Sequence, residues 1–140
     1  MTIASYTALR QDLAADFKAA IAVPYNLAVQ WENAPFVEPE GAIAWIAWNV
    51  LTAEEQEVAR GYPQNLWRCT GIMKVRLFAP IEHGIGNLLA LADLIADRYR
   101  GSTIGAVQFL GIEIKGAEGR REDDSWVVIV DCIFYADRKA

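Results

Sequence analysis

Residues 66–79 read Leu-Trp-Arg-Cys-Thr-Gly-Ile-Met-Lys-Val-Arg-Leu-Phe-Ala, and apolar and polar side chains alternate along most of this stretch. Successive side chains of a strand point to opposite faces of its sheet, so the alternation predicts a strand with one buried face. Such half-buried strands are typical of antiparallel sheets. One face carries Trp67, Cys69, Met73, Val75 and Leu77, and the other carries Arg68, Thr70, Lys74 and Arg76.

A helix is expected before this strand, from about Ser5 to Ala22. Its apolar residues recur every three or four positions and form one stripe, and Pro24 ends it. A short strand is expected at Leu27 to Trp31, and Ala42 to Leu51 predicts a strand that is apolar on both faces. The helix stripe consists of Tyr6, Leu9, Leu13, Phe17 and Ile21.

The carboxyl-terminal half predicts one more helix and two more strands. Ile85 to Arg100 carries apolar residues at helical spacing. Strands are expected at Gly105 to Lys115 and at Ser125 to Tyr135, joined by the polar turn Gly116 to Asp124. The last strand is apolar on both faces, and Asp131 interrupts that pattern.

These elements predict one α+β domain over residues 1–140, in the order α-β-β-β-α-β-β. Short connections favour antiparallel neighbours, so we expect a mainly antiparallel sheet with the two helices packed on one face. Two helices cannot cover both faces, yet the strands at 42–51 and 126–135 are apolar on both. Another subunit is the simplest cover for the second face.

Composition argues against nucleic-acid and membrane partners. The chain has 140 residues, 54% of them hydrophobic and 22% charged, and a net charge of −5. Contact with a phosphate backbone needs clustered Lys and Arg, which this acidic chain lacks. The amino terminus has no signal pattern, and no apolar run reaches the roughly 20 residues that cross a bilayer. We therefore expect a soluble cytoplasmic protein.

The search for catalytic chemistry is negative. His83 is the only histidine, and a lone histidine before a helix is usually solvated or capping. The glycine-flanked segment 83–87 lacks the third glycine of a dinucleotide fingerprint, and the acidic run 122–124 is more often solvated than cation-binding. Cys69 and Cys132 lie within expected strands, which favours buried reduced thiols over a disulfide. No catalytic residue, cofactor or metal is expected.

One connection is longer than a compact domain needs. Thr52 to Asn65 separates two expected strands and is acidic over its first half. It is either a mobile hairpin tip or a docking arm that is mobile in the free chain and orders on a partner. Its candidate partner-binding residues are Glu54, Glu55, Glu57, Val58, Arg60, Tyr62 and Pro63.

The segment Trp31 to Pro39 predicts a structural corner and not a ligand site. Asn33 can turn the backbone through its side chain, and Pro35 fixes the next bend. Trp31 and Phe36 are expected to anchor the corner in the core.

On these residues the chain resembles the tail terminator-like proteins of long-tailed bacteriophages and prophages, a family of minor tail proteins. That family has a starting helix, a Trp-Glu-Asn-x-Pro-Phe segment with a further proline, a strand ending in apolar-Phe-x-Pro, and an Ala/Leu-Ala-Asp helix. A closing strand with a tryptophan corresponds to Ser125 to Tyr135. The matching residues are Trp31, Glu32, Asn33, Pro35, Phe36, Pro39, Gly71, Val75, Phe78, Pro80, Gly84, Gly86 and Leu91-Ala92-Asp93.

The resemblance implies a structural virion assembly protein that forms a homo-oligomeric ring, typically a hexamer. Such a ring caps the tail tube, ends its polymerisation and offers the head-tail joining surface. The implied partners are other copies of the chain, the tail tube protein and the head-tail connector protein. The implied location is the host bacterial cytoplasm during assembly, then the virion tail. The acidic segment 52–65 departs from the family's simplest pattern.

Two other functions stay open. A head-tail connector or neck completion protein could share this architecture, and attachment to heads or to tails would separate the two. A small ligand-binding domain or enzyme is the alternative of a different class. It would need a deep polar pocket with convergent titratable groups, which the sequence does not predict.

Overall fold

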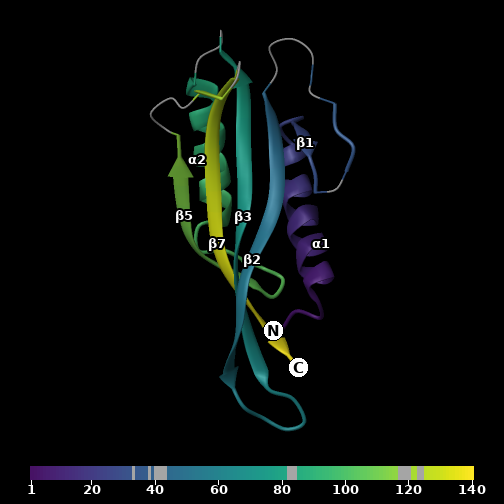
Figure 1. Cartoon of the computed structure of the whole chain (residues 1–140). Coiled ribbons are helices and arrows are strands. Elements are labelled where there is room, and N and C mark those ends of the chain that lie inside the picture. The colour runs from purple at the N-terminus through teal and green to yellow at the C-terminus, as the bar shows by residue number, and fades with distance from the viewer. Residues whose placement is uncertain (33, 38, 40–43, 82–84, 117–120, 123–124) are drawn as a thin grey trace.

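The computed structural model describes residues 1–140 except 33, 38, 40–43, 82–84, 117–120 and 123–124. Within these residues the chain has an α+β architecture, as expected, with two α-helices and one twisted, mostly antiparallel sheet (Figure 1). The helical elements are α1 (Tyr6–Phe17), the π-helical turn η1 (Lys18–Ala22) and α2 (Gly86–Tyr99). The strands are β1 (Ala28–Gln30), β2 (Trp45–Ala59), β3 (Leu66–Pro80), β4 (Thr103–Ile104), β5 (Val107–Lys115), β6 (Arg121–Glu122) and β7 (Ser125–Lys139).

The strands lie in the order β1-β2-β3-β7-β5-β4, and β6 pairs with β7 off this path. Among the strands of the described residues, only β1 with β2 is a parallel pair. The centre of the sheet is β3 with β7, which pair along their whole length, from Leu66 opposite Lys139 to Pro80 opposite Ser125. The stretch 66–79 therefore forms the middle of the sheet, where its alternation has the greatest effect on packing.

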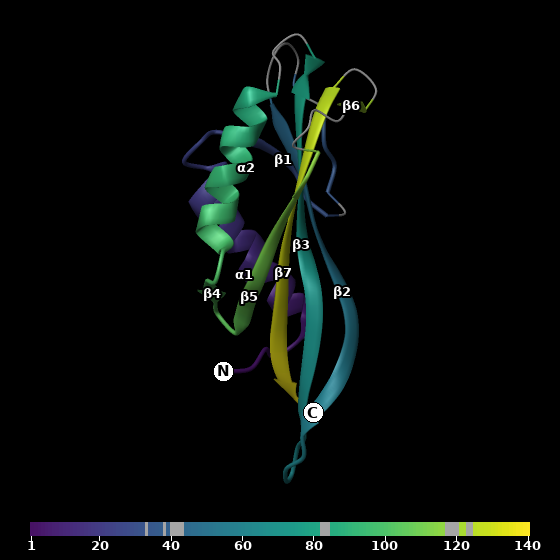
Figure 2. The same ribbon diagram turned by 90° about the vertical axis from the view of Figure 1, so that its left-hand side faces the viewer.

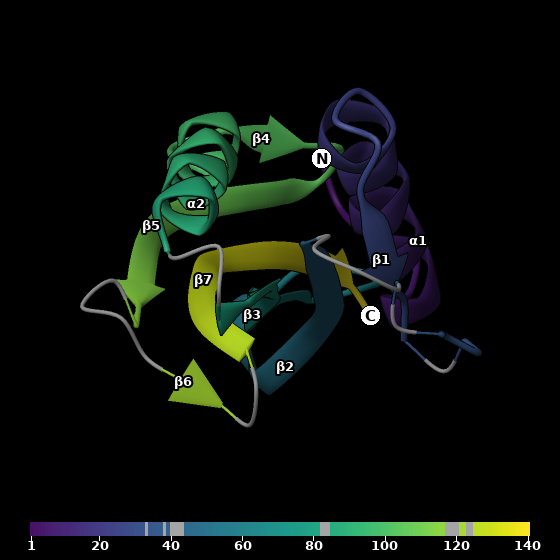
Figure 3. The same cartoon turned by 90° about the horizontal axis from the view of Figure 1, so that it is seen from above.

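The predicted alternation of β3 is confirmed. Met73, Val75 and Leu77 are fully buried on one face, whereas Lys74 and Arg76 are half-buried on the other. We call these the helix face and the outer face of the sheet. Figures 2 and 3 show α1 and α2 on the same side of the strands.

The main hydrophobic core lies between the helices and the helix face. α1 begins at Ser5, whose hydroxyl accepts a hydrogen bond from Ala8 N–H at 3.1 Å and caps the helix. Asp16 joins the two helices, because its carboxylate accepts from Tyr99 Oη at 2.8 Å and from Arg98 Nη2 at 2.5 Å. The buried helix residues include Leu9, Leu13, Phe17, Leu88, Ala92, Ile95 and Tyr99.

The expectation that Thr52 to Asn65 is a long unstructured connection is wrong. Instead, β2 continues to Ala59, and its second half pairs with the start of β3. The register shifts at two places in this half, the first between Thr52 and Glu55. Such a shift inserts a residue and exchanges the two faces, so the alternation in the sequence breaks although the strand continues.

The short connection that remains, residues 60–65, closes a hairpin. We call residues 52–70 the arm; they comprise the second half of β2, this connection and the start of β3. Figure 1 shows the arm extending past both chain ends and away from the helices. Val58 and Tyr62 are exposed apolar residues of the arm.

The arm also explains why β7 is longer than expected. It runs to Lys139 and not to Tyr135, because its last residues pair with the first residues of β3. The strand expected from Gly105 begins instead at Val107, since Gly105 turns between β4 and β5 with a φ of 58°. The turn expected at 116–124 lies mostly outside the described residues.

Candidate functional site

The tip of the arm is closed by side-chain hydrogen bonds of Glu57 and Asn65. The Glu57 carboxylate accepts from Arg60 Nε at 2.6 Å and from Asn65 Nδ2 at 3.0 Å. Asn65 Oδ1 accepts from Gly61 N–H at 3.1 Å, and the Asn65 backbone exchanges two hydrogen bonds with Ala140. Glu57 therefore stabilises the turn and is partly shielded, whereas the Arg60 side chain is 87% exposed.

The root of the arm is tied to α1. Tyr6 Oη donates a short hydrogen bond to the Glu55 carboxylate, and the Arg138 guanidinium lies 5.6 Å from the centre of the Tyr6 ring. Glu55 faces Cys69 across the strand pair, and Cys69 is buried. Of the acidic residues proposed for partner binding, Glu55 is thus engaged by the domain itself.

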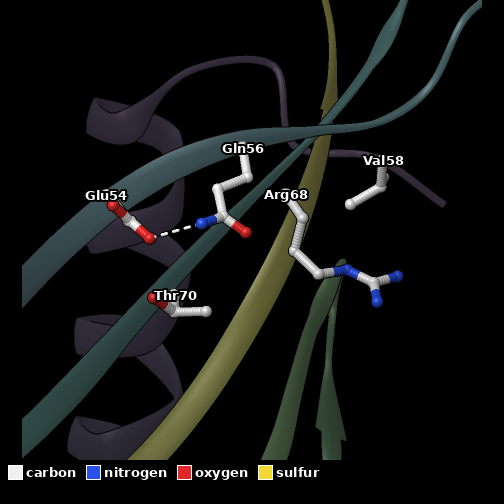
Figure 4. A pocket seen from close by; sticks show the side chains of 5 residues that line it. All are labelled: Glu54, Gln56, Val58, Arg68 and Thr70. Atoms are coloured by element: carbon white, nitrogen blue, oxygen red, sulfur yellow. Dashed lines mark hydrogen bonds between the residues drawn. The ribbon is translucent and has the colours of Figure 1, made fainter.

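The outer side of the arm carries Glu54. Figure 4 shows it with Gln56, Val58, Arg68 and Thr70 around a small hollow of about 80 Å³. Gln56 Nε2 donates to Glu54 Oε1 at 2.5 Å, and within the described residues no Lys or Arg lies within ion-pair distance of Glu54. The volume of this hollow is far below the roughly 300 Å³ of a typical small-molecule site, so the hollow suits contact with the surface of another protein.

Arg68 is a residue of the arm that the sequence placed only on a polar face. Its Nε and Nη2 donate to Asp137 at 2.8 Å and 3.0 Å, and its guanidinium lies 4.1 Å from the centre of the Tyr135 ring. The hydrogen bond with Asp137 raises the pKa of Arg68. These contacts hold the base of the arm rigidly against β7.

The tip of the arm presents apolar side chains to solvent. Tyr62 is 99% exposed and Val58 is 45% exposed, and Pro63 is exposed as well. Aromatic and aliphatic groups that protrude without a core are typical of contact surfaces. Of the seven candidate residues, the structure thus leaves Glu54, Val58, Arg60, Tyr62 and Pro63 accessible.

The corner after β1 passes round the edge of the sheet. Trp31 packs on the helix face, with its ring centre 5.3 Å from Trp48 and 6.1 Å from Phe17. Phe36 packs on the outer face, 5.2 Å from Trp45. The two aromatic residues therefore anchor opposite sides of β2, where we had expected a single core.

Between these anchors, Glu32 binds the edge of β2. Its Oε2 accepts from Val50 N–H at 3.2 Å and pairs with Arg10 Nη1 of α1 at 2.6 Å. The described residues place no strand beside β2 on this side after Ala47, where pairing with β1 ends. Pro35 is exposed, and Asn33 lies outside the described residues.

The chain itself covers part of the outer face. Trp45 stacks on Phe78 with ring centres 4.1 Å apart, and a small second cluster forms around them. A row of three apolar residues further along stays open: Leu51 lies opposite Ile72, and Ile72 opposite Ile133. Leu51 is 47% exposed and Ile133 is 36% exposed.

Asp131 lies between these two apolar regions and is almost fully buried. Lys115 Nζ is 3.0 Å and Lys74 Nζ 3.9 Å from its carboxylate, whose Oδ1 accepts no hydrogen bond from the described residues. The hydrogen bond to Asp131 raises the pKa of Lys115. The break in the apolar pattern of β7 is thus a charged cluster that crosses three strands.

The described residues form no group of His, Cys, Asp and Glu that could hold a metal ion. Cys69 and Cys132 are both free and buried, and burial raises the pKa of Cys132 to about 12. His83 lies outside the described residues. No helix among the described elements is long and apolar enough to cross a membrane.

Comparison with known proteins finds similarity in fold. No protein-family model matches the sequence, and no curated protein matches it. Among the solved structures that match, one has a TM-score of 0.59 and 16% sequence identity, and the match covers 92% of this chain and 95% of that structure's chain. At that identity the match shows the fold alone.

Proposed function

We propose that this chain is a tail terminator-like assembly protein of a long-tailed bacteriophage or prophage. Copies of it form a closed ring, typically a hexamer, that caps the tail tube, ends its polymerisation and offers a surface to the head-tail connector. In this proposal the tail terminator-like domain consists of the expected order α-β-β-β-α-β-β, with two helices packed on one face, and of the short strands β4 and β6, which the sequence did not predict. The ring assembles in the bacterial cytoplasm and stays in the virion tail.

The arm is the observation that carries this proposal. It is a rigidly rooted hairpin with exposed Val58 and Tyr62, and it leads away from the hydrophobic core. An element of this kind adds little to the stability of its own domain, so its use lies in contact with another molecule. Four hollows that described residues line have volumes of about 80 to 260 Å³, below the roughly 300 Å³ of a typical small-molecule site, which supports an assembly role.

The outer face supports self-association. It keeps an open apolar row at Leu51, Ile72 and Ile133 beside the charged cluster of Asp131. A protein interface typically has an apolar centre with a polar rim. A closed ring would also cover the open edge of β2, which otherwise invites unlimited strand pairing.

The test is to add the purified chain to tail tube protein from the same genome while tubes polymerise. We expect tube growth to stop, and electron micrographs to show a ring of protein at one tube end. The net charge of −5 leads us to expect no salt-sensitive affinity for duplex DNA under the same conditions. Unchanged tube growth with no protein at the ends would contradict the proposal.

A binding assay with purified heads and purified tails separates the connector alternative. A tail terminator binds finished tails that lack heads, whereas a head completion protein binds DNA-filled heads that lack tails. If the chain bound heads but not tails, the result would favour a head-tail connector or neck completion protein.

A further inference from the structure

We propose that the arm of one copy docks beside Arg76 of the next copy, with Glu54 paired to Arg76. This contact would join neighbouring subunits head to tail, and it rests on the ring proposed above.

The receiving hollow lies on the edge of β2, where β1 ends. It has a volume of about 200 Å³, and its lining includes Gln30, Glu32, Asn49 and Arg76. Polar side chains dominate this lining, and the neighbouring edge of β2 has no strand partner among the described residues. The hollow therefore suits a polar or anionic group on a protein surface better than an apolar ligand.

Arg76 is the charge in the hollow that the described residues leave unpaired. It is half-buried, its guanidinium lies 5.7 Å from the centre of the Phe78 ring, and no described carboxylate lies within ion-pair distance. Glu32 does not compensate it, because Glu32 already pairs with Arg10. A half-buried guanidinium with an open side is well placed to bind a carboxylate.

Glu54 is the matching group on the arm. Among the three acidic residues of the arm, Glu55 is bonded to Tyr6 and Glu57 to Arg60, while Glu54 is exposed and bonded only to the neutral Gln56. Val58 lines the same small hollow of the arm as Glu54. The arm thus presents a carboxylate with no ion partner among the described residues, and the hollow presents a guanidinium with none, which gives a complementary pair of charges.

The pair cannot form within one chain. Ala47 lies opposite Arg76 in the ladder, and Glu54 follows seven residues later on the same strand. At about 3.3 Å per residue, the backbone positions of Glu54 and Arg76 are up to roughly 23 Å apart along the hairpin, which is further than the two side chains can span. The contact must therefore join two copies, and because it uses two different surfaces it is head to tail, which is the arrangement that closes into a ring.

The experiment uses the full chain with Glu54→Arg, Arg76→Glu and the double variant. Self-association is measured by light scattering and native mass spectrometry over a range of concentrations. We expect each single reversal to weaken self-association about tenfold or more, because it places like charges together. The double variant should regain self-association to within about threefold of the natural chain. An equimolar mixture of the two single variants should also assemble, but only into rings with an even number of subunits, in which the variants alternate.

Arg100→Glu is the matched control, because it makes the same charge change at the exposed end of α2. All variants should keep the melting temperature of the natural chain, which excludes unfolding as the cause. Single reversals that associate as well as the natural chain, or a double variant that stays dissociated, would overturn the docking and leave the ring proposal intact. A natural chain that remains monomeric both alone and at the tube end would overturn both.

Discussion

The same two strands, β2 and β3, form two regions of different character. In the first region, residues 45–50 of β2 pair with residues 73–78 of β3, and alternate side chains enter the core under the helices. In the second region, the arm, the same strands continue through two register shifts, and most side chains are exposed. The backbone ladder is shared, but the packing is not.

The two regions therefore have different roles: the first stabilises the fold, and the arm has exposed side chains that can bind a partner. The first region is stabilised by burial of apolar side chains. The arm is stabilised by its ladder and by local contacts such as Arg68 with Asp137 and Tyr6 with Glu55. Substitutions should therefore affect stability in the first region and association in the arm.

The largest expected effect is that of a cavity in the first region. Leu77 is fully buried, so Leu77→Ala should lower the free energy of unfolding by about 2–5 kcal/mol. Val58→Ala, at an exposed site in the arm, should change it by less than about 0.5 kcal/mol. Urea unfolding measures both values. Equal losses from the two variants would mean that the arm is packed as tightly as the core.

Gly71 lies where the two regions meet. A Cβ added there would lie 2.6 Å from Phe134 Cζ and 2.8 Å from the Leu51 carbonyl oxygen, so a side chain needs the backbone to move. Gly71→Ala should cost about 1–3 kcal/mol of stability. Gly86→Ala is the control, because nothing lies within 4 Å of its added Cβ, and it should be neutral or stabilising by up to about 1 kcal/mol. If Gly71→Ala and Gly86→Ala lost the same stability, the close contact between Phe134 and Gly71 would not be the reason that residue 71 is a glycine.

The smallest effect is in thiol reactivity. Burial raises the pKa of both cysteines, for Cys132 to about 12, so at pH 8 both stay protonated and react slowly with a thiol reagent. Cys69 lies at the root of the arm and Cys132 in the middle of β7, opposite Met73. Local opening of the arm exposes Cys69 alone, so mass spectrometry should find it labelled first. Earlier labelling of Cys132 would place the weakest part of the fold elsewhere.

Sequence reasoning succeeded where side-chain periodicity reports packing. The alternation of β3 and the helical stripe through Leu9, Leu13 and Phe17 both correspond to buried faces. Those patterns exist because one side of each element lies against the core, so burial and pattern have the same cause.

It failed for the arm, because there the strand exists without a buried face. Residues 52–59 are mostly polar and contain register shifts, so nothing in their order indicates a strand. Pairing with β3, which itself pairs with β7, imposes the strand. The corner failed for a related reason. Nothing in the order of Trp31 and Phe36 shows that the chain passes round the edge of β2 between them.

The central claim is that the arm gives this protein its tail-capping function. The most direct test is to shorten the arm and measure the length of the tails. Replacing Glu57 to Trp67 by Asn-Gly joins Gln56 to Arg68, which face each other in the ladder, through a two-residue hairpin turn. We expect a folded protein with a melting temperature within about 5 °C of the natural one. In a phage or prophage that carries this variant, electron micrographs should show tails that grow past their normal length. Tails of normal length would contradict the account.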